Sequence, residues 1–325
     1  MKPFKTHRQQ LTILRSRSLN TGNGSHSMRY LEEENYYNVI NGYKGLFLKK
    51  DDDGRFFEPE EYIDGAHIDE IFCLFKLDRG LRNIYVKYLL KFESNLKSFI
   101  AYRFAEKFKE PNAYLDLNNY SKDSRKIKAV LKTISILSNT ISQQVSKKSK
   151  NSIDHYVDKH GGVPIWVLVN YITIGNVSYF YSVLDDSLAE NIAKDFNTKY
   201  NRERKKQQSL LMQRKELESI IKIVNIMRNV CAHEERFYSK KAKDNRIAYF
   251  ANFFDIDQEL LRQGSLFTLT ILLRAVLSKK DSQALHRELR DIFKQYKNCF
   301  ASVKIESILK IMGFPANWRL YMEPI

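Results

Sequence analysis

Residues 215–241 read KELESIIKIVNIMRNVCAHEERFYSKK, and this stretch decides the fold. Its apolar side chains recur every three or four residues, as they do along one face of an α-helix. One continuous stripe on that face consists of Leu217, Ile221, Val224, Arg228 and Cys231. The pattern predicts an amphipathic helix with a guanidinium at a position where an apolar side chain is expected.

The remaining sequence predicts the same class of structure. Helix breakers are sparse, with 6 Pro and 12 Gly among 325 residues. Further helices are expected at 5–17, 81–108, 122–147, 163–184, 187–197, 205–233, 265–278, 281–297 and 302–312. An alternating pattern around Asp53-Gly54 leaves room for one short β-hairpin. We therefore expect an all-α protein with an N-terminal extension (1–60) and a helical domain (61–325).

The charge of the chain points to a polyanionic partner. Its 54 Lys and Arg residues exceed its 38 Asp and Glu residues, for a formal charge of +16. Such an excess attracts RNA, DNA or anionic membranes. The three cysteines are widely spaced and form no disulfide framework, which fits a reducing cytoplasm.

Residues 161–184 test the membrane alternative. The segment carries no charged residue and is long enough to cross a bilayer. It also contains asparagine, serine and tyrosine side chains, and the chain offers no second such span. We expect a buried core helix at 163–184 and no membrane association, and a membrane-associated toxin is the less favoured alternative.

Arg228, Asn229 and His233 are the candidate catalytic residues. A histidine can exchange protons near neutral pH, and an arginine can stabilise charge that builds up on a phosphate. This set is sufficient for RNA cleavage without a metal or another cofactor, and neither is expected here. The alternative is structural: a buried arginine paired with a core carboxylate, followed by a histidine that caps the helix.

Basic residues flank the candidate site in the sequence. Residues 199–215 carry seven Lys and Arg against one Glu, and aromatic residues are interspersed among the basic ones on both sides of the site. This composition suits phosphate contacts combined with base stacking. The expected RNA-binding residues are Arg202, Arg204, Lys205, Lys206, Arg236, Lys240 and Lys241. A competing metal site at His155 and His160 has little support.

The segment RNVCAHEERFY (228–238) resembles the RN-x-x-x-H signature of the HEPN superfamily, many of whose members are ribonucleases. Over nearly its full length, the chain is similar to the Abi family of phage abortive-infection proteins, of the AbiD/AbiF type. Segments that carry this likeness include ENYYNVINGY, IDEIFCLFKLDRGLRNIYVKYLLKFESNLKSFIAYRF, VPIWVLVNYITIGNVSYFYSVL and MGFPANW. In the second of these, Asp78, Arg79, Arg82 and Glu93 occupy the polar positions.

Two departures from the family pattern are visible. Ser18 stands where a glycine usually follows the arginine matched by Arg17, and Glu234 and Glu235 stand where the family usually has His or Asn. The three signature residues themselves are intact.

The resemblance implies a HEPN-type helical bundle, a homodimer with a composite site, and RNA cleavage that arrests an infected cell. It also implies a structured small non-coding RNA as a partner. The alternative is a HEPN protein that binds such an RNA as a sensor or scaffold without cutting it.

Helix geometry independently favours a dimer. Arg228 and His233 are five residues apart, which separates them by roughly 140° around a regular helix. The two side chains converge only if the helix distorts at its end or if a second chain supplies one of them. In a dimer packed at this helix, the partner chain is expected to cover part of Val224 and Cys231.

Overall fold

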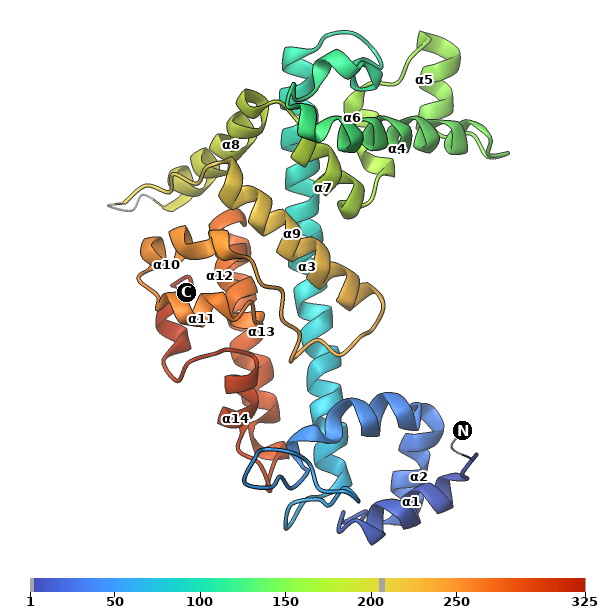
Figure 1. The fold of residues 1–325 in the computed structure, drawn as a ribbon, viewed down its shortest axis with the longest axis vertical. Coiled ribbons are helices and arrows are strands. Elements are labelled where there is room, and N and C mark those ends of the chain that lie inside the picture. Colours follow the sequence, from blue (N-terminus) through green and yellow to red (C-terminus); the bar gives the residue numbers. More distant parts are fainter. Residues whose placement is uncertain (1–2, 205–207, 325) are drawn as a thin grey trace.

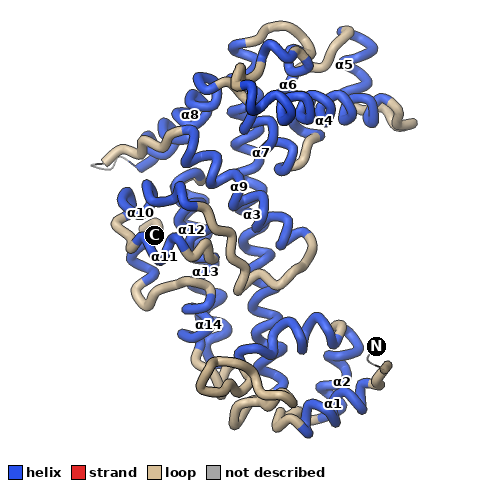
Figure 2. Tube along the Cα trace, viewed as in Figure 1, coloured by secondary structure: helices blue, strands red, loops and turns tan. Residues whose placement is uncertain are grey.

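A computed structural model describes residues 3–204 and 208–324 of the chain. Those residues form helices and loops with no β-strand, which confirms the all-α class (Figure 2). Near Asp53 there are only isolated antiparallel bridges, Lys50 with Phe56 and Leu48 with Tyr62. The expected hairpin is thus a turn with two isolated bridges, since neither flank extends into a strand.

A single long helix, α3 (Ile68–Lys107), forms the axis of the molecule (Figure 1). It has 40 residues, which corresponds to a length of about 60 Å. His67 caps its first turn, because the ring accepts a hydrogen bond from the Asp69 N–H while Glu70 accepts one from the His67 N–H. Apolar side chains are buried along its whole length because other helices cover it on several sides.

The helix α3 begins 13 residues before the expected start at residue 81. Gly80 lies within it and does not end it. A Cβ atom at Gly80 would lie 2.6 Å from Cδ1 of Ile292 in α13 (Lys279–Tyr296), so the glycine lets the two helices approach closely. Tertiary packing therefore outweighs the weak helix propensity of this residue.

The N-terminal residues pack around the first turns of α3. Helices α1 (His7–Ser16) and α2 (Gly24–Glu33) are followed by a π-turn, η1 (Tyr37–Asn41), and a 3-10 turn, η2 (Lys44–Leu46). The ring of Tyr30 stacks on Phe72 of α3 with centroids 4.2 Å apart, and Tyr43 reaches Asp78. These contacts join the segment to the same apolar core as the rest of the chain.

Residues 163–184 form two helices where one was expected. The segment divides into α6 (Ile165–Leu168), a 3-10 turn η6 (Val169–Tyr171) and α7 (Ile174–Val183). Ile172 is extended, and the Thr173 hydroxyl accepts a hydrogen bond from the Asn176 N–H to cap α7. Within the described part of the chain, no helix is long and apolar enough to cross a membrane.

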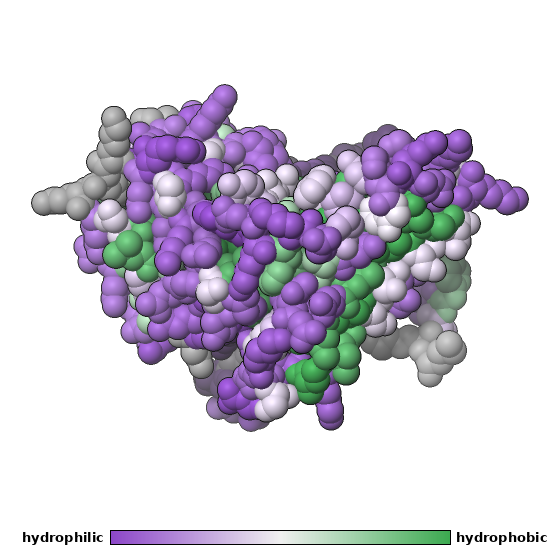
Figure 3. All heavy atoms as spheres, turned by 90° about the horizontal axis from the view of Figure 1, so that it is seen from above, coloured by the Kyte–Doolittle hydropathy of each residue, from purple (hydrophilic) through white to green (hydrophobic). Residues whose placement is uncertain are grey.

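The distal end of α3 carries α4 (Ile127–Val145) and α5 (Ser152–His160), which follow three short 3-10 turns, η3 (Ala113–Leu115), η4 (Leu117–Asn119) and η5 (Ser124–Lys126). One face of α4 packs on the core, whereas Ile127, Leu131 and Val145 are exposed. In the view from above, apolar side chains form a band across this end of the molecule (Figure 3).

Helix α8 (Asp186–Arg204) packs beside α9 (Arg214–Ala232), and the chain between them is not helical where it is described. Asn197 in α8 forms two hydrogen bonds with the backbone of Met212, and Asn201 forms two with Leu210. These side chains hold residues 208–213 alongside α8, which is why α9 starts later than the expected residue 205.

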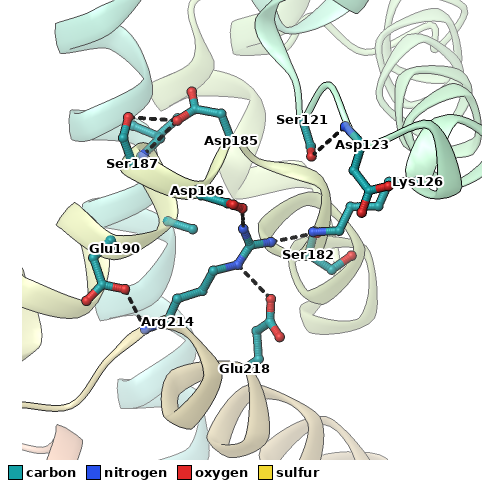
Figure 4. A network of polar contacts seen from close by, with 12 residues as sticks. Ser121, Asp123, Lys126, Ser182, Asp185, Asp186, Ser187, Glu190, Arg214 and Glu218 are labelled. Atoms are coloured by element: carbon teal, nitrogen blue, oxygen red, sulfur yellow. Dashed lines mark hydrogen bonds and ion pairs between the residues drawn. The ribbon is translucent and has the colours of Figure 1, made fainter.

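A polar network holds the beginning of α9 (Figure 4). The Arg214 guanidinium pairs with Asp186, donates to Glu218 at 2.9 Å and donates to the Ser182 carbonyl at 3.0 Å. The Arg214 N–H also donates to Glu190 at 2.9 Å. The start of α9 is therefore tied to both α7 and α8.

The C-terminal third of the chain covers the middle of α3. It comprises η7 (Asn245–Ile247), α10 (Ala248–Phe254), α11 (Gln258–Arg262), α12 (Leu266–Val276), α13, η8 (Lys297–Cys299), α14 (Ile305–Ile311) and η9 (Trp318–Tyr321). Every residue of α12 is buried. Glu70 of α3 accepts hydrogen bonds from the backbone of Ala301 and Ser302, which attaches this region to the start of the long helix.

Candidate functional site

The candidate site occupies the last turn of α9. Leu217, Ile221 and Val224 face the core of their own chain, and Val224 is 0% exposed. Cys231 is also buried. The expectation that a partner chain covers Val224 and Cys231 is therefore wrong, because the chain's own helices already cover them.

Arg228 lies at the boundary between this core and the solvent. Its side chain is 30% exposed, and its Nε is 3.9 Å from Oε2 of the largely buried Glu93 in α3. That separation is too long for a hydrogen bond, and Glu93 Oε2 has no hydrogen-bond partner among the described residues. The other oxygen of Glu93 pairs with Lys97 at 2.8 Å. Arg228 thus has a carboxylate nearby and is also open to a ligand.

Asn229 and His233 are exposed at the same helix end. His233 follows the last helical residue as the C-cap, and its N–H donates to the Asn229 carbonyl at 3.0 Å. The α-helical hydrogen-bond pattern therefore continues to His233 without distortion. Consequently, the separation of roughly 140° between Arg228 and His233 remains in the folded chain.

The helix ends in a Schellman motif, in which two backbone N–H groups after the C-cap turn back to the last carbonyls. The Glu235 N–H donates to Val230 at 3.1 Å, and the Glu234 N–H reaches the Cys231 carbonyl at 3.4 Å. The motif requires a left-handed residue, and Glu234 adopts it with φ of 53°. Glycine or asparagine usually occupies this position, so the glutamate side chain strains the turn directly after His233.

A buried carboxylate fixes the chain beyond this turn. Asp78 of α3 accepts hydrogen bonds from the Tyr43 hydroxyl at 2.6 Å and from Arg82 at 2.8 Å. It also accepts the backbone N–H groups of Phe237 and Tyr238. Arg82 in turn donates to the Glu235 carbonyl at 3.2 Å. The loop that follows His233 is therefore attached to the axis of the molecule on both sides of Arg236.

Burial changes the pKa of two groups beside the site, Asp78 and Cys231. Burial raises the pKa of Asp78, but four donors directed at one carboxylate, among them a guanidinium, favour the ionised form. Burial also raises the pKa of the Cys231 thiol to about 12. At neutral pH this thiol is protonated, so it is not a nucleophile, although it belongs to the signature segment.

The basic residues expected to bind RNA fall into two separate groups. Arg236, Lys240 and Lys241 lie in the loop directly after the site. Arg236 donates to the Gly42 carbonyl at 2.9 Å, and Lys240 pairs with Glu235 at 3.3 Å. This group adjoins His233.

The second group begins in the last turn of α8, whereas the candidate site lies in the last turn of α9. Arg202 is exposed there. Arg204 is buried, because its Nε pairs with Glu323 at 2.7 Å and its other nitrogens face carbonyls of α12 and of the residue after it. Arg204 is thus not available on the surface. Lys205 and Lys206 lie outside the described residues.

Metal ligands do not gather in the described part of the chain, where no group of three or more His, Cys, Asp or Glu side chains could hold an ion. His155 and His160 lie on α5, with ring centroids 5.8 Å apart. They are on the distal unit of the fold, away from α9.

Three residues of α3 support the site, although the sequence identifies them only as polar positions. Asp78 and Arg82 hold the loop after His233, and Glu93 faces Arg228. The available signal was their spacing: Asp78 with Arg82, and Glu93 with Lys97, are charge pairs four residues apart within an otherwise apolar helix. Helical spacing alone does not indicate that these pairs lie beside the last turn of α9.

The protein is all-α, and it presents arginine, asparagine and histidine at a helix end that neighbouring residues hold in place. Residues 29–239 match the family model described as Abi-like protein, which is about two thirds of the chain. The chain therefore belongs to the Abi-like family, a family of abortive-infection proteins. The matched range extends from α2 to the loop after α9 and includes the whole candidate site. No curated protein and no solved structure matches the chain.

Replacing Asp78 with asparagine should destabilise the whole fold. The substitution leaves Arg82 without its buried counter-charge, and loss of one partner of such a pair typically costs about 3–5 kcal/mol. We expect Asp78→Asn to lower the free energy of unfolding by about that amount in urea titrations. Asp123→Asn, which removes a surface partner of Arg125, is the control and should leave the free energy of unfolding close to that of the wild type. Equal losses for both variants would contradict the anchoring role of Asp78.

Replacing Glu234 with glycine should stabilise the protein. Relief of the left-handed strain is worth about 1–2 kcal/mol, and the greater freedom of glycine in the unfolded chain offsets part of it. We expect a net gain of about 0.5–1 kcal/mol in the free energy of unfolding. Glu235→Gly is a matched control, because Glu235 has no positive φ and glycine there brings only the entropic cost. A loss of stability in Glu234→Gly would show that the turn is not strained.

Proposed function

We propose that the protein is a HEPN-type, metal-independent endoribonuclease of the AbiD/AbiF type, which acts in the cytoplasm and arrests the infected cell. The observation that carries this proposal is the open, anchored end of α9. Arg228, Asn229 and His233 reach solvent there, while the Asp78 cluster holds the adjoining loop. The three free cysteines are consistent with a reducing compartment.

The chemistry uses the substrate's own 2′-hydroxyl as the nucleophile. His233 takes the proton of that hydroxyl, or gives a proton to the departing 5′-oxygen, while the 2′-oxygen attacks the phosphorus. The bond from phosphorus to the 5′-oxygen breaks, leaving a 2′,3′-cyclic phosphate and a 5′-hydroxyl. Arg228 stabilises the charge on the phosphate oxygens, and Asn229 orients the histidine or a phosphate oxygen.

The structural alternative for Arg228 accounts for less of the geometry. A purely structural arginine would be buried and hydrogen-bonded to its carboxylate, whereas Arg228 is 30% exposed and 3.9 Å from Glu93. Its guanidinium therefore keeps its donors for a ligand, with Glu93 as an electrostatic neighbour. His233 is a helix C-cap in the structure, but its exposed ring leaves it free for proton transfer.

The undistorted helix end favours a composite site. Arg228 and His233 of one chain diverge, so a symmetric homodimer with α9 near its two-fold axis would bring Arg228 of one chain toward His233 of the other. Arg236, Lys240 and Lys241 would extend this cleft with phosphate contacts, and Arg202 would contact RNA farther away.

A second candidate function is RNA binding without cleavage. The positive net charge and the basic loop beside the site serve equally well to hold a structured small non-coding RNA as a sensor or scaffold. The two functions differ in what Arg228 does, because a scaffold needs its charge only for binding.

Substitution of the catalytic residues should abolish cleavage. We expect Arg228→Ala and His233→Ala to reduce RNA cleavage by roughly 100- to 10,000-fold and to relieve the growth arrest caused by the wild type in bacteria. Cleavage by the wild type should persist in EDTA and leave a 2′,3′-cyclic phosphate, detectable by mass spectrometry.

Arg262→Ala is the matched control, because Arg262 is an exposed arginine on α11 whose one ion pair among the described residues is with Glu259. It should cleave like the wild type. If folded Arg228→Ala and His233→Ala proteins cut RNA normally, the nuclease assignment is wrong. If they bind RNA and the wild type never cuts it, the scaffold function is correct.

A composite site should allow complementation between inactive chains. Mixing Arg228→Ala with His233→Ala subunits should restore part of the activity, because each mixed dimer contains one intact pair. Ultracentrifugation should give twice 38.4 kDa for the protein. A monomer that cuts RNA, or two variants that remain inactive in stable mixed dimers, would argue against a site shared between chains.

A further inference from the structure

A groove of about 930 Å³ runs along α3 from Leu90 toward the distal end of the molecule. Residues of α3 form one wall, and α6 with η6 forms the other. Glu93 lines the near end of the groove and is also the residue that faces Arg228. Glu106 lies about 20 Å farther along the helix axis, and Lys109, just beyond the end of α3, lines the far end. The groove is therefore continuous with the environment of the proposed catalytic arginine.

Two aromatic rings stand exposed in this groove. Tyr102 is 62% exposed and Trp166 is 55% exposed, although each could lie in the core of a protein of this size. The other tryptophan of the chain, Trp318, is 4% exposed and packs among aromatic side chains. Exposed rings of this size in one groove offer flat surfaces for stacking.

The polar lining of the groove suits nucleobases better than a phosphate backbone. Ser94, Ser98 and Asn170 contribute neutral donors and acceptors. The Lys97 charge is paired with Glu93, and Glu106 is paired with Arg103, so the middle of the groove is close to neutral. A polyanion backbone would instead select exposed lysines and arginines, such as Arg236 and Lys241 in the loop after His233.

We propose that this groove binds the single-stranded part of the RNA substrate, with unpaired bases stacked on Trp166 and Tyr102. This inference rests on the proposed function, because the groove would set the path of the RNA strand whose phosphate lies at Arg228. The bases enter the groove while the phosphates remain toward solvent. A duplex does not fit this description, because its bases are already stacked on each other.

Tryptophan fluorescence tests the proposal on the full-length protein. The probe is a 12-residue oligouridylate with 2′-O-methyl riboses, which cannot be cleaved through the 2′-oxygen. Stacking on Trp166 should quench the exposed emission of the wild type. The quench should vanish in Trp166→Phe, because the remaining Trp318 is buried.

Affinity for the same probe provides the second measurement. Trp166→Ala and Tyr102→Ala should each weaken binding by roughly 5- to 100-fold, whereas Trp166→Phe, which keeps a ring, should retain most of the affinity. Tyr37→Ala is the matched control, since Tyr37 is a highly exposed aromatic residue in the N-terminal segment, and it should bind like the wild type. Unchanged affinity in Trp166→Ala, or no quench in the wild type, would overturn the proposal.

The other occupant of such a groove would be a second copy of the chain. In that case the emission of Trp166 would shift to the blue as the protein concentration rises without RNA, and Trp166→Ala would dissociate the dimer. That result would also overturn the proposal.

Failure of the groove and failure of the nuclease assignment give different results. If Arg228→Ala abolishes cleavage while Trp166→Ala changes neither quench nor affinity, the groove does not bind the RNA and the nuclease assignment is supported. If the probe quenches Trp166 but the wild type cuts no RNA, the groove is an RNA-binding site and the nuclease assignment is wrong.

Discussion

The carboxylate of Asp78 is the point on which the site depends. It joins three parts of the chain that are far apart in sequence: the N-terminal segment through Tyr43, the axis helix through Arg82, and the loop after α9 through the N–H groups of Phe237 and Tyr238. Four donors satisfy one buried charge, so none of these parts can move without leaving a polar group unpaired. The exposed residues at the end of α9 thereby receive a fixed frame.

Charged residues in this structure are of two kinds: some are buried and paired within the fold, and others are open to a ligand. Charges that are buried, such as Arg204 with Glu323 or Arg82 with Asp78, are paired and serve the fold. Arg228 is near a carboxylate without a hydrogen bond to it, and His233 is exposed, so both retain capacity for a ligand. The contrast between these two kinds of arginine supports the functional proposal more than the short signature does.

Helix periodicity was enough to predict the all-α class and the approximate position of most helices. It failed where distant residues decide the local structure: Ile292 makes Gly80 favourable inside α3, the Asn197 and Asn201 side chains keep residues 208–213 out of α9, and Thr173 divides 163–184. The same limit applies to the candidate site. Arg228, Asn229 and His233 could be selected from one helix, but neither the burial of Arg204 nor the proximity of Glu93 and Asp78 is encoded in neighbouring residues.

The length of α3 has an evolutionary consequence. The helix carries the anchor at Asp78, the neighbour of Arg228 at Glu93 and the wall of the groove from Leu90 to Glu106, all in one unbroken register. Inserting one residue between Asp78 and Glu93 would turn every later position by about 100° and would shift it by about 1.5 Å. The loops of the protein can lengthen or shorten among relatives, whereas this segment can change its length only in steps that restore the helical phase.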